Sequence, residues 1–120
     1  MELPLTGTFR KSERLCGKIS IAALLGKGRW IAGTHIKCCY RALPPESECS
    51  RIAVSVPKRN FKRAVKRNLL KRRMRESYRT QKSILDAGRY DIMFVWTSRE
   101  LADSNVIREE TAQLLKRISK

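Results

Sequence analysis

The spacing of apolar side chains changes several times along the chain, and each change predicts a new structural element. Residues 18–25 (KISIAALL) place apolar side chains at helical intervals, and Gly26 and Gly28 favour an end to that helix. Residues 30–43 read as a strand, in which Ile36, Cys38 and Tyr40 alternate with Lys37, Cys39 and Arg41. Pro4 and Gly7 discourage a helix near the start of the chain, so the first dozen residues are expected to be extended.

The middle of the chain predicts a turn, a strand and a long helix. Residues 44–48 (PPESE) have the composition of a turn, and residues 51–56 (RIAVSV) read as a second strand that Pro57 ends. From about residue 60 to residue 83 Gly and Pro are absent and good helix formers dominate. We therefore expect one continuous helix there.

The last third predicts a central strand and an amphipathic helix. Residues 90–96 (YDIMFVW) form an apolar run suited to a strand buried on both faces, and residues 104–118 form a helix that Ser104 or Asn105 can cap. One buried stripe is expected on that helix, namely Ile107, Thr111, Leu114, Leu115 and Ile118. The fold class is α+β: a single-domain sandwich over residues 1–120, with one central sheet of about four strands and helices packed on it.

Charge is the dominant chemical feature of this pattern. Residues 58–75 contain ten Lys or Arg and no Asp or Glu, and the net charge of the whole chain is +16. Cations this dense repel one another unless a polyanion is near, so nucleic acid is the first-choice partner and an anionic membrane the second. The plainer alternative is a charged surface that only meets water. With 42% hydrophobic residues the chain is expected to fold rather than to form a disordered basic arm.

The basic helix has two separate faces. At about 100° per residue, Asn68, Arg72 and Arg75 fall on one side with Lys71 beside them. A different stripe can pack on the sheet, and it consists of Leu70, Met74 and Tyr78. Arg offers a planar fork to phosphate, and the Asn68 amide can contact a base edge, a 2′-hydroxyl or a metal-bound water, or can simply face solvent.

The sequence shows no constellation of catalytic or metal-binding side chains. His35 is the only histidine and falls in the first predicted strand without an obvious partner. Four acids do not form a recognisable carboxylate cluster, and we interpret each as a solvated or capping residue. These acids are Asp86, Asp91, Glu109 and Glu110. We therefore assign no catalytic and no metal-ligating residue to the protein.

The cysteines and the N-terminal residues indicate the cellular compartment in which the protein is expected. Cys16, Cys38, Cys39 and Cys49 form no Cys-x-x-Cys pair, so we read them as small buried hydrophobes in a reducing cytoplasm. Residues 1–10 lack the apolar core of a signal peptide, and no stretch is long and apolar enough to cross a bilayer. The expected location is cytoplasmic.

Two adjacent segments together resemble the protein subunit of bacterial ribonuclease P. Residues 52–59 (IAVSVPKR) match a family strand that ends in a basic residue, and residues 64–76 (AVKRNLLKRRMRE) match the helix motif A-V-x-R-N-R-x-K-R-x-x-R-E. Arg14-Leu15, the opening of the strand at Tyr90-Asp91-Ile92 and the amphipathic last helix have similar spacing. The resemblance covers roughly residues 9–118, and the helix motif is more specific than a generic run of Lys and Arg.

The resemblance implies a βαβ crossover of unusual left-handed sense and a role in a ribonucleoprotein. Such a protein binds a large catalytic RNA and the 5′ leader of precursor transfer RNA, and the RNA cleaves the phosphodiester bond with Mg²⁺ that is bound mainly by the RNA. No protein partner and no membrane are implied. The expected RNA-binding residues are Arg59, Lys62, Arg63, Lys66, Arg67, Asn68, Lys71, Arg72 and Arg75. The residues expected to line the leader-binding cleft are Val54, Val56, Lys58, Ile21, Leu25 and Tyr40.

Two positions depart from the family pattern. Leu69 stands where the motif usually has Arg, and Arg73 points elsewhere on the helix, so one cationic contact is missing. Ile21 and Leu25 occupy the positions of two leader-facing aromatics, and neither side chain stacks on a base as a ring does. Leader binding is then expected to be weaker, or to use Tyr40 or Trp30, although both of these also suit a core or sheet-face position.

Two other classes of protein remain as alternatives. A ribosomal RNA-binding protein without a processing role shares the size and the charge, and it would follow ribosomal particles. A DNA-binding regulator fits less well, because Pro57 and a strand stand where a helix-turn-helix needs its first helix.

Overall fold

A four-stranded mixed sheet forms the centre of the fold, with strand order β1-β2-β4-β3. β1 (Arg29–Ala32) pairs antiparallel with β2 (Ile36–Ala42), and β2 pairs antiparallel with β4 (Tyr90–Trp96). β3 (Arg51–Ser55) pairs parallel with β4. β4 is therefore a central strand as predicted, and β1 and β3 are the edges.

The structure is a computed structural model that describes residues 18–44, 50–85 and 88–119. The predicted extended N-terminal segment, most of the predicted turn at 44–48, Asp86, Cys16 and Cys49 lie outside the described residues.

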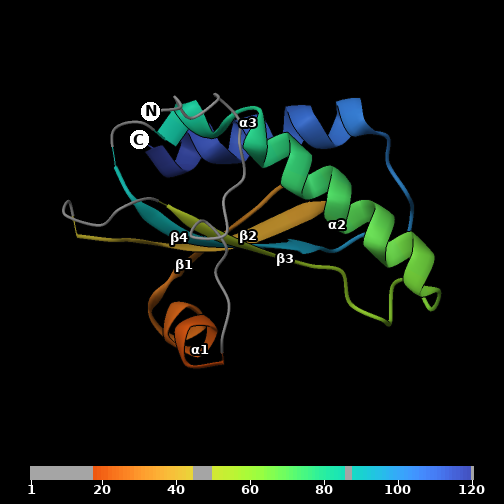
Figure 1. The fold of residues 1–120 in the computed structure, drawn as a ribbon, viewed down its shortest axis with the longest axis horizontal. Coiled ribbons are helices and arrows are strands. Elements are labelled where there is room, and N and C mark those ends of the chain that lie inside the picture. The colour runs from red at the N-terminus through yellow and green to blue at the C-terminus, as the bar shows by residue number, and fades with distance from the viewer. Residues whose placement is uncertain (1–17, 45–49, 86–87, 120) are drawn as a thin grey trace, which may run out of the picture.

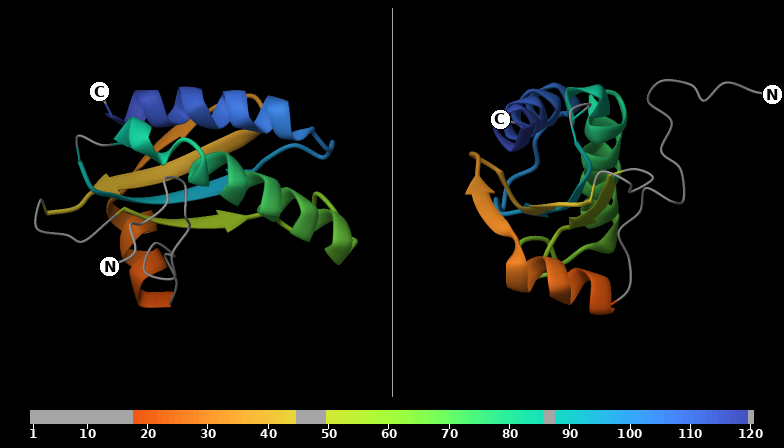
Figure 2. Two further views of the ribbon diagram at one scale, coloured as in Figure 1. Left: turned by 45° about the horizontal axis from the view of Figure 1, so that its top comes forward. Right: turned by 90° about the vertical axis from the view of Figure 1, so that its left-hand side faces the viewer.

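Helices cover both faces of the sheet. α1 (Lys18–Lys27) lies on one face, and α2 (Ala64–Arg79) and α3 (Ser104–Ser119) lie side by side on the other (Figure 1 and Figure 2). α2 and a short 3-10 helix, η2 (Lys82–Leu85), connect the parallel strands β3 and β4. This arrangement confirms the predicted α+β sandwich and its βαβ unit, and the handedness of the crossover stays a prediction.

The main hydrophobic core lies between the sheet and the pair α2 and α3. The α2 stripe Leu70, Met74 and Tyr78 is buried there, as predicted. The complete predicted α3 stripe is buried as well, and its members are Ile107, Thr111, Leu114, Leu115 and Ile118. Each fully buried aliphatic side chain contributes about 1.5–3 kcal/mol to folding, so these stripes fix the rotation of both helices about their axes.

A second, smaller core lies under α1 on the opposite face of the sheet. Leu24 and Cys39 are fully buried there, with Ile21 packed against them. Cys38 belongs to the main core instead, so the two neighbouring cysteines point to opposite faces of β2.

The predicted single strand over residues 30–43 is wrong, because the chain turns back within it. β1 ends at Ala32, and Gly33 donates its backbone N–H to the Ile36 carbonyl at 2.7 Å, which closes a hairpin. Trp30 then lies opposite Cys39. His35 sits in the turn rather than in a strand.

A close approach explains the glycine at the junction of α1 and β1. α1 continues past Gly26 to Lys27, and the Gly28 N–H donates to the Leu24 carbonyl at 2.6 Å. A Cβ at Gly28 would lie 2.5 Å from Cys39 Sγ, a distance that real side chains do not reach. Only glycine lets β1 leave the helix so close to β2.

The basic helix begins later than predicted because residues 58–60 form a turn. The Asn60 backbone N–H donates to the Pro57 carbonyl at 3.1 Å, and the Asn60 side-chain amide donates to the Trp96 carbonyl at 3.0 Å. The turn is therefore fastened to the end of β4. α2 itself runs from Ala64 to Arg79, and the Thr80 N–H donates to the Glu76 carbonyl at 3.1 Å where the helix ends.

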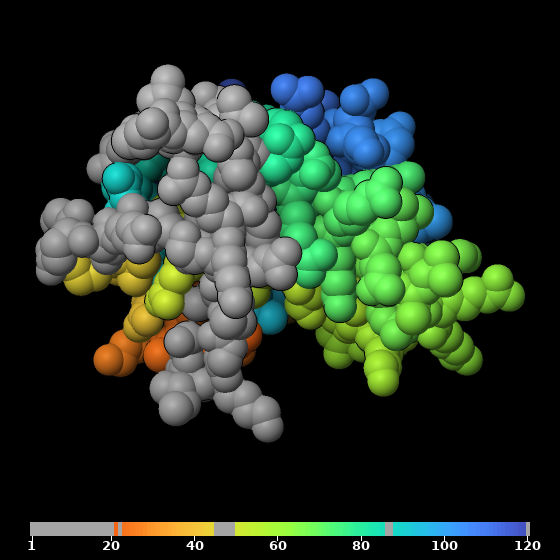
Figure 3. Space-filling model, in the orientation of Figure 1, coloured from red at the N-terminus to blue at the C-terminus, as the bar shows by residue number. Residues whose placement is uncertain are grey.

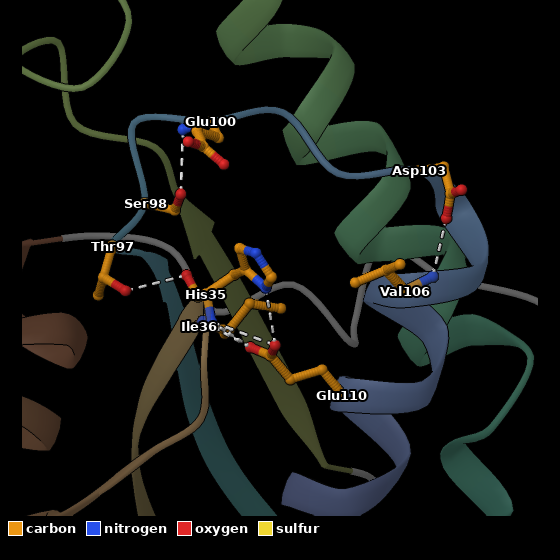
Figure 4. Close-up of polar contacts among 8 residues, drawn as sticks. All are labelled: His35, Ile36, Thr97, Ser98, Glu100, Asp103, Val106 and Glu110. Atoms are coloured by element: carbon orange, nitrogen blue, oxygen red, sulfur yellow. Dashed lines mark hydrogen bonds and ion pairs between the residues drawn. The ribbon is translucent and has the colours of Figure 1, made fainter.

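The cap of α3 differs from the two predicted residues. Asp103 Oδ1 accepts the Val106 backbone N–H at 2.9 Å, so Asp103 takes the capping role expected of Ser104 or Asn105 (Figure 4). Within residues 18–44, 50–85 and 88–119, no helix combines the length and the apolar character that a membrane span requires.

Candidate nucleic-acid interface

Five exposed cations surround the start of α2, on the turn after β3 and in the first helical turn. They are Lys58, Arg59, Lys62, Arg63 and Lys66. The side chains of this region project from one end of the molecule, at the right of Figure 3. The first turn of α2 contains no acid, and the N-cap residue Arg63 makes no side-chain capping bond. The positive end of the helix dipole adds to these charges, so this end of the protein favours phosphate.

Arg67 holds this end of the protein together. Its Nη1 donates to the carbonyls of Phe61 and Lys62, both at 2.8 Å, and the residue is half-buried. Phe61 is itself buried in the main core, so Arg67 braces the turn against the helix. A guanidinium has five N–H donors, and the remaining three can still bind a phosphate. Arg67 is thus a positioning residue as well as a predicted RNA contact.

The outer face of α2 presents the remaining predicted contacts. Asn68, Arg72 and Arg75 are exposed, and Lys71 is half-buried at the edge of this face. Three exposed residues at these spacings fall within about 60° of one another around the helix axis. Because the buried stripe fixes the rotation of α2, the structure does bring these side chains to one solvent-facing side. We call Asn68, Lys71, Arg72 and Arg75 the α2 ridge.

Arg73 does not substitute for the missing cation at Leu69. Its Nη1 donates to the Ala102 carbonyl at 2.6 Å, which ties α2 to the segment before α3. The Arg73 guanidinium is therefore held by a contact within the fold. This agrees with the prediction that Arg73 points elsewhere on the helix and does not replace the missing cation. Leu69 is half-buried and lies between the exposed face and this contact.

The only acid of α2 lies near its C-terminal end and is paired. Glu76 Oε2 accepts from Arg79 Nη2 at 2.6 Å. The hydrogen bond from Arg79 lowers the pKa of Glu76, and the same bond raises the pKa of Arg79. Glu76 therefore stays ionised and engaged. Because it is the only acid of α2, the N-terminal half of the helix carries positive charge alone.

The residues predicted to line a leader-binding cleft do not share one face, so that prediction needs correction. Val54 and Tyr40 are half-buried against the main core under α2 and α3, and Val56 is buried in it. Ile21 packs into the small core under α1, on the opposite face of the sheet. Strand alternation forces this separation, because successive side chains point to opposite faces.

Leu25 and Lys58 keep positions that a ligand can reach. Leu25 is 42% exposed on α1, and Lys58 is exposed in the turn after β3. The sheet face next to α1 includes Ala53 and Met93, which the sequence analysis did not select. The alternation of side chains along β3 could have selected Ala53, because Ala53 lies between Ile52 and Val54 and therefore points to the opposite face of the sheet.

His35 has a partner, contrary to the prediction. Its Nδ1 lies 3.1 Å from Glu110 Oε1, and its ring stacks on Trp96 with the centroids 5.3 Å apart. Glu110 also accepts the backbone N–H groups of His35 at 2.9 Å and Ile36 at 2.6 Å (Figure 4). Glu110 is therefore neither solvated nor a cap, and it locks the β1–β2 turn onto α3.

Asp91 is likewise a structural acid rather than a solvated one. Its carboxylate is fully buried and accepts from Arg51 Nε and Nη2, both at 2.8 Å, and from Arg41 Nη2 at 3.4 Å. These three residues join β2, β3 and β4 on the α1 side of the sheet. Charge pairing satisfies the carboxylate and leaves it no free position for a ligand.

The two described cysteines are poor nucleophiles. Burial raises the pKa of the Cys38 thiol to about 12, and burial also raises the pKa of Cys39. Both thiols are free. Among the residues that the structure describes, no group of three or more His, Cys, Asp or Glu side chains is arranged to hold a metal ion.

Comparison with protein families identifies the family of the chain that carries this basic face. The family model described as Ribonuclease P matches residues 9–119. This chain belongs to the ribonuclease P protein family. The resemblance noted in the sequence is confirmed, and membership assigns the chain to a ribonuclease that processes transfer RNA and works with an RNA subunit.

Individual ribonuclease P proteins agree in sequence and in fold. The chain is 33% identical over 126 residues to the ribonuclease P protein component of Porphyromonas gingivalis, covering 99% of this chain and 92% of that protein. It is 40% identical over 88 residues to the component of Petrotoga mobilis, covering 73% and 71%. The solved ribonuclease P protein of Thermotoga maritima superposes with a TM-score of 0.75 at 25% identity, covering 88% and 96%. These relatives are ribonuclease P proteins and not ribosomal proteins, so the ribosomal alternative is set aside.

Proposed function

We propose that the α2 ridge and the cationic turn before it bind a catalytic RNA, and that this RNA cuts the 5′ leader from precursor transfer RNA. The observation that carries the proposal is the fixed, acid-free basic end of α2 in a ribonuclease P protein. A buried stripe sets its direction, and Arg67 and Asn60 hold its base. A rigid array loses little conformational freedom when it meets a folded RNA.

The protein's share of the reaction is electrostatic. His35 pairs with Glu110, Glu76 and Asp91 pair with Arg side chains, and Asp103 caps α3. The exposed acids Glu100 and Glu109 belong to no group of three or more potential metal ligands among the described residues. We assign the bond cleavage to the RNA and no catalytic residue to the protein. A face of Lys and Arg repels a divalent cation, and these residues do not fit a protein-held Mg²⁺. We therefore place Mg²⁺ on the RNA, where the protein's positive charge reduces repulsion between phosphates that converge around it.

The substrate in this proposal is precursor transfer RNA, recognised partly through its single-stranded leader. Leu25 and Lys58 support such a contact, because both side chains are exposed. The free thiols of Cys38 and Cys39 are compatible with a reducing compartment. We accordingly place the complex in the cytoplasm.

A reconstitution with the cognate catalytic RNA tests the proposal. Added protein is expected to lower the Mg²⁺ concentration needed for half-maximal cleavage of precursor transfer RNA, and to tighten binding of leader-bearing substrate relative to mature transfer RNA. The protein alone is expected to cut neither. Cleavage that is indifferent to the protein, or cleavage by the protein alone, would overturn the proposal.

Two double variants with equal loss of charge separate the α2 surface from charge in general. Lys62→Ala with Arg72→Ala removes two exposed cations from the proposed surface, and Arg108→Ala with Lys116→Ala removes two exposed cations from α3. The first pair is expected to weaken RNA binding strongly and the second only slightly. Equal losses would show that net charge, not this surface, drives association.

A further inference from the structure

Three parts of the chain meet at the end of β4. Trp96, the last residue of β4, is fully buried, and its carbonyl accepts the side-chain amide of Asn60 at 3.0 Å. The His35 ring stacks on the Trp96 ring. The His35 carbonyl accepts the backbone N–H and the hydroxyl of Thr97, at 2.8 and 3.0 Å (Figure 4). Since Glu110 of α3 in turn holds His35, the Trp96 carbonyl is a fixed anchor for the turn that follows β3.

The turn that Asn60 fastens is crowded with like charges. Residues 57–63 (PKRNFKR) contain four cations and no acid, and all four cationic side chains are exposed. Within the described residues these side chains make no hydrogen bond or ion pair. They are Lys58, Arg59, Lys62 and Arg63. Because like charges repel one another, the direction in which they point depends on the bonds that the rest of the turn makes.

The two halves of this turn are held in different ways. In the second half, Phe61 is buried in the main core, and Arg67 donates to the carbonyls of Phe61 and Lys62. In the first half, the bond from the Asn60 N–H to the Pro57 carbonyl closes the turn locally, and the Asn60 amide ties it to β4. Asn60 is half-buried and neutral, so it adds no charge that would attract RNA. What it supplies is the direction of its cationic neighbours.

We propose that Asn60 is a positioning residue that makes the cationic turn selective for a folded RNA over a flexible polyanion. This inference rests on the proposed function and adds a determinant of its selectivity. A folded RNA presents its phosphates at fixed places, so a turn that already points towards them binds without first losing conformational freedom. A flexible polyanion fits its phosphates to cations in any arrangement, and its counterions are released in the same way. Fixing the turn therefore favours the folded RNA alone.

Gln81 provides the matched control, because its side-chain amide makes the same kind of bond at the other end of α2. Gln81 Nε2 donates to the Ser77 carbonyl at 3.0 Å and to the Arg108 carbonyl at 2.9 Å, and the residue is half-buried like Asn60. These bonds join the C-terminal end of α2 to α3, whereas the cationic turn precedes the N-terminal end of α2. Gln81→Ala therefore removes a neutral amide from the fold and leaves the cationic turn unchanged.

Titrations of the full-length protein with the cognate catalytic RNA and with long-chain inorganic polyphosphate measure this selectivity. Asn60→Ala keeps the net charge, and it is expected to weaken binding of the RNA about tenfold, which corresponds to about one lost phosphate contact, and binding of polyphosphate less than about twofold. The slope of log K against log salt for the RNA should flatten by about 0.7–0.9 although no cation has been removed. Hydrogen exchange of residues 57–63 should become faster in the same variant. Gln81→Ala should leave the RNA affinity, the slope and the exchange of residues 57–63 unchanged.

Three results would overturn the positioning role of Asn60. They are an unchanged RNA affinity in Asn60→Ala, an equal loss for RNA and polyphosphate, and a loss of RNA affinity in Gln81→Ala as large as that in Asn60→Ala. The last result would mean that overall stability, and not the direction of the turn, limits binding.

A second pair of variants covers the case in which Asn60→Ala does not fold. Asn60→Gln keeps an amide donor, whereas the side chain of Asn60→Ser is too short to reach the Trp96 carbonyl. Asn60→Gln is expected to bind the catalytic RNA more tightly than Asn60→Ser, and the reverse order would contradict the role of the amide. If the original protein neither binds the catalytic RNA nor assists cleavage, the proposed function fails. If the original protein does both and the Asn60 variants match it, only this inference fails.

Discussion

Arg72 offers the cleanest single test of the α2 ridge, because its side chain makes no hydrogen bond within the described fold. It is exposed on the outer face of α2 and makes no hydrogen bond or ion pair within the residues that the structure describes. Its one described interaction is a Coulombic attraction to Glu76, which is smaller than the effect of the Arg79 hydrogen bond on that carboxylate. Arg72→Ala therefore removes a cation from the ridge and keeps the buried stripe and the turn before the helix intact. Alanine is also the best helix former, so α2 itself is not weakened.

The size of the effect follows from one lost phosphate contact. A charge-assisted hydrogen bond at an exposed site contributes about 1.5 kcal/mol, which is roughly tenfold in affinity at low salt. Each phosphate contact adds about 0.7–0.9 to the slope of log K against log salt, so the slope for Arg72→Ala should flatten by that amount. Between about 50 and 200 mM salt the deficit should accordingly shrink from about tenfold to about threefold.

Filter binding of the catalytic RNA across a salt series measures both quantities. Lys116→Ala removes the same charge from the exposed side of α3, and it should change the slope little. Arg73→Ala removes a cation of α2 that is committed to the Ala102 carbonyl, so it should lower stability by about 1 kcal/mol with a smaller change in slope. A slope for Arg72→Ala equal to that of the original protein, or equal flattening in all three variants, would refute the assignment of the ridge.

Three further predictions concern the core, the thiols and α1. Asp91→Asn leaves two partly exposed guanidinium groups without their carboxylate and should lower the free energy of unfolding by about 2–3 kcal/mol in urea titrations; a loss below about 0.5 kcal/mol would contradict the structural role of Asp91. Because burial raises the pKa of Cys38 from 9.0 to about 12, the unfolded chain releases this proton first, and native stability should fall as pH rises from about 9 towards 12. Cys38→Ala should make that fall shallower, and identical pH profiles would argue against it. Leu25→Phe places a ring on the exposed side of α1 and should tighten binding of leader-bearing precursor by up to about tenfold, with no change for mature transfer RNA; an unchanged affinity would mean that the leader does not reach α1.

The periodic elements could be predicted from sequence because their burial repeats along the chain. β4 matches its predicted bounds, and α3 matches within a residue, since both carry an uninterrupted apolar pattern. The break at Gly33 was missed because the strand pattern of residues 36–41 was extended back over residues 30–35, which do not share it. The start of α2 was missed because the Asn60 amide bonds to β4, a contact that no local pattern reveals.

The sequence predicted the charge of the site correctly, but it did not predict which face of the sheet the cleft residues occupy. The outer face of α2 follows from helix geometry alone. The cleft residues failed for a physical reason: Ile52 and Val54 form the more apolar side of β3, Val56 continues that side just after the strand, and this side packs on the larger core. Asp91 and Glu110 were read as solvated because their partners, Arg51, Arg41 and His35, are distant in sequence.

The short outer strands bear on how this protein exists before it meets RNA. β1 has four residues and β3 has five, and each begins with an Arg. Edge-to-edge addition of a second copy would gain few backbone hydrogen bonds and would bring like charges together. A chain this cationic is thereby discouraged from building intermolecular sheets, and it can remain dispersed at the concentrations at which it waits for assembly.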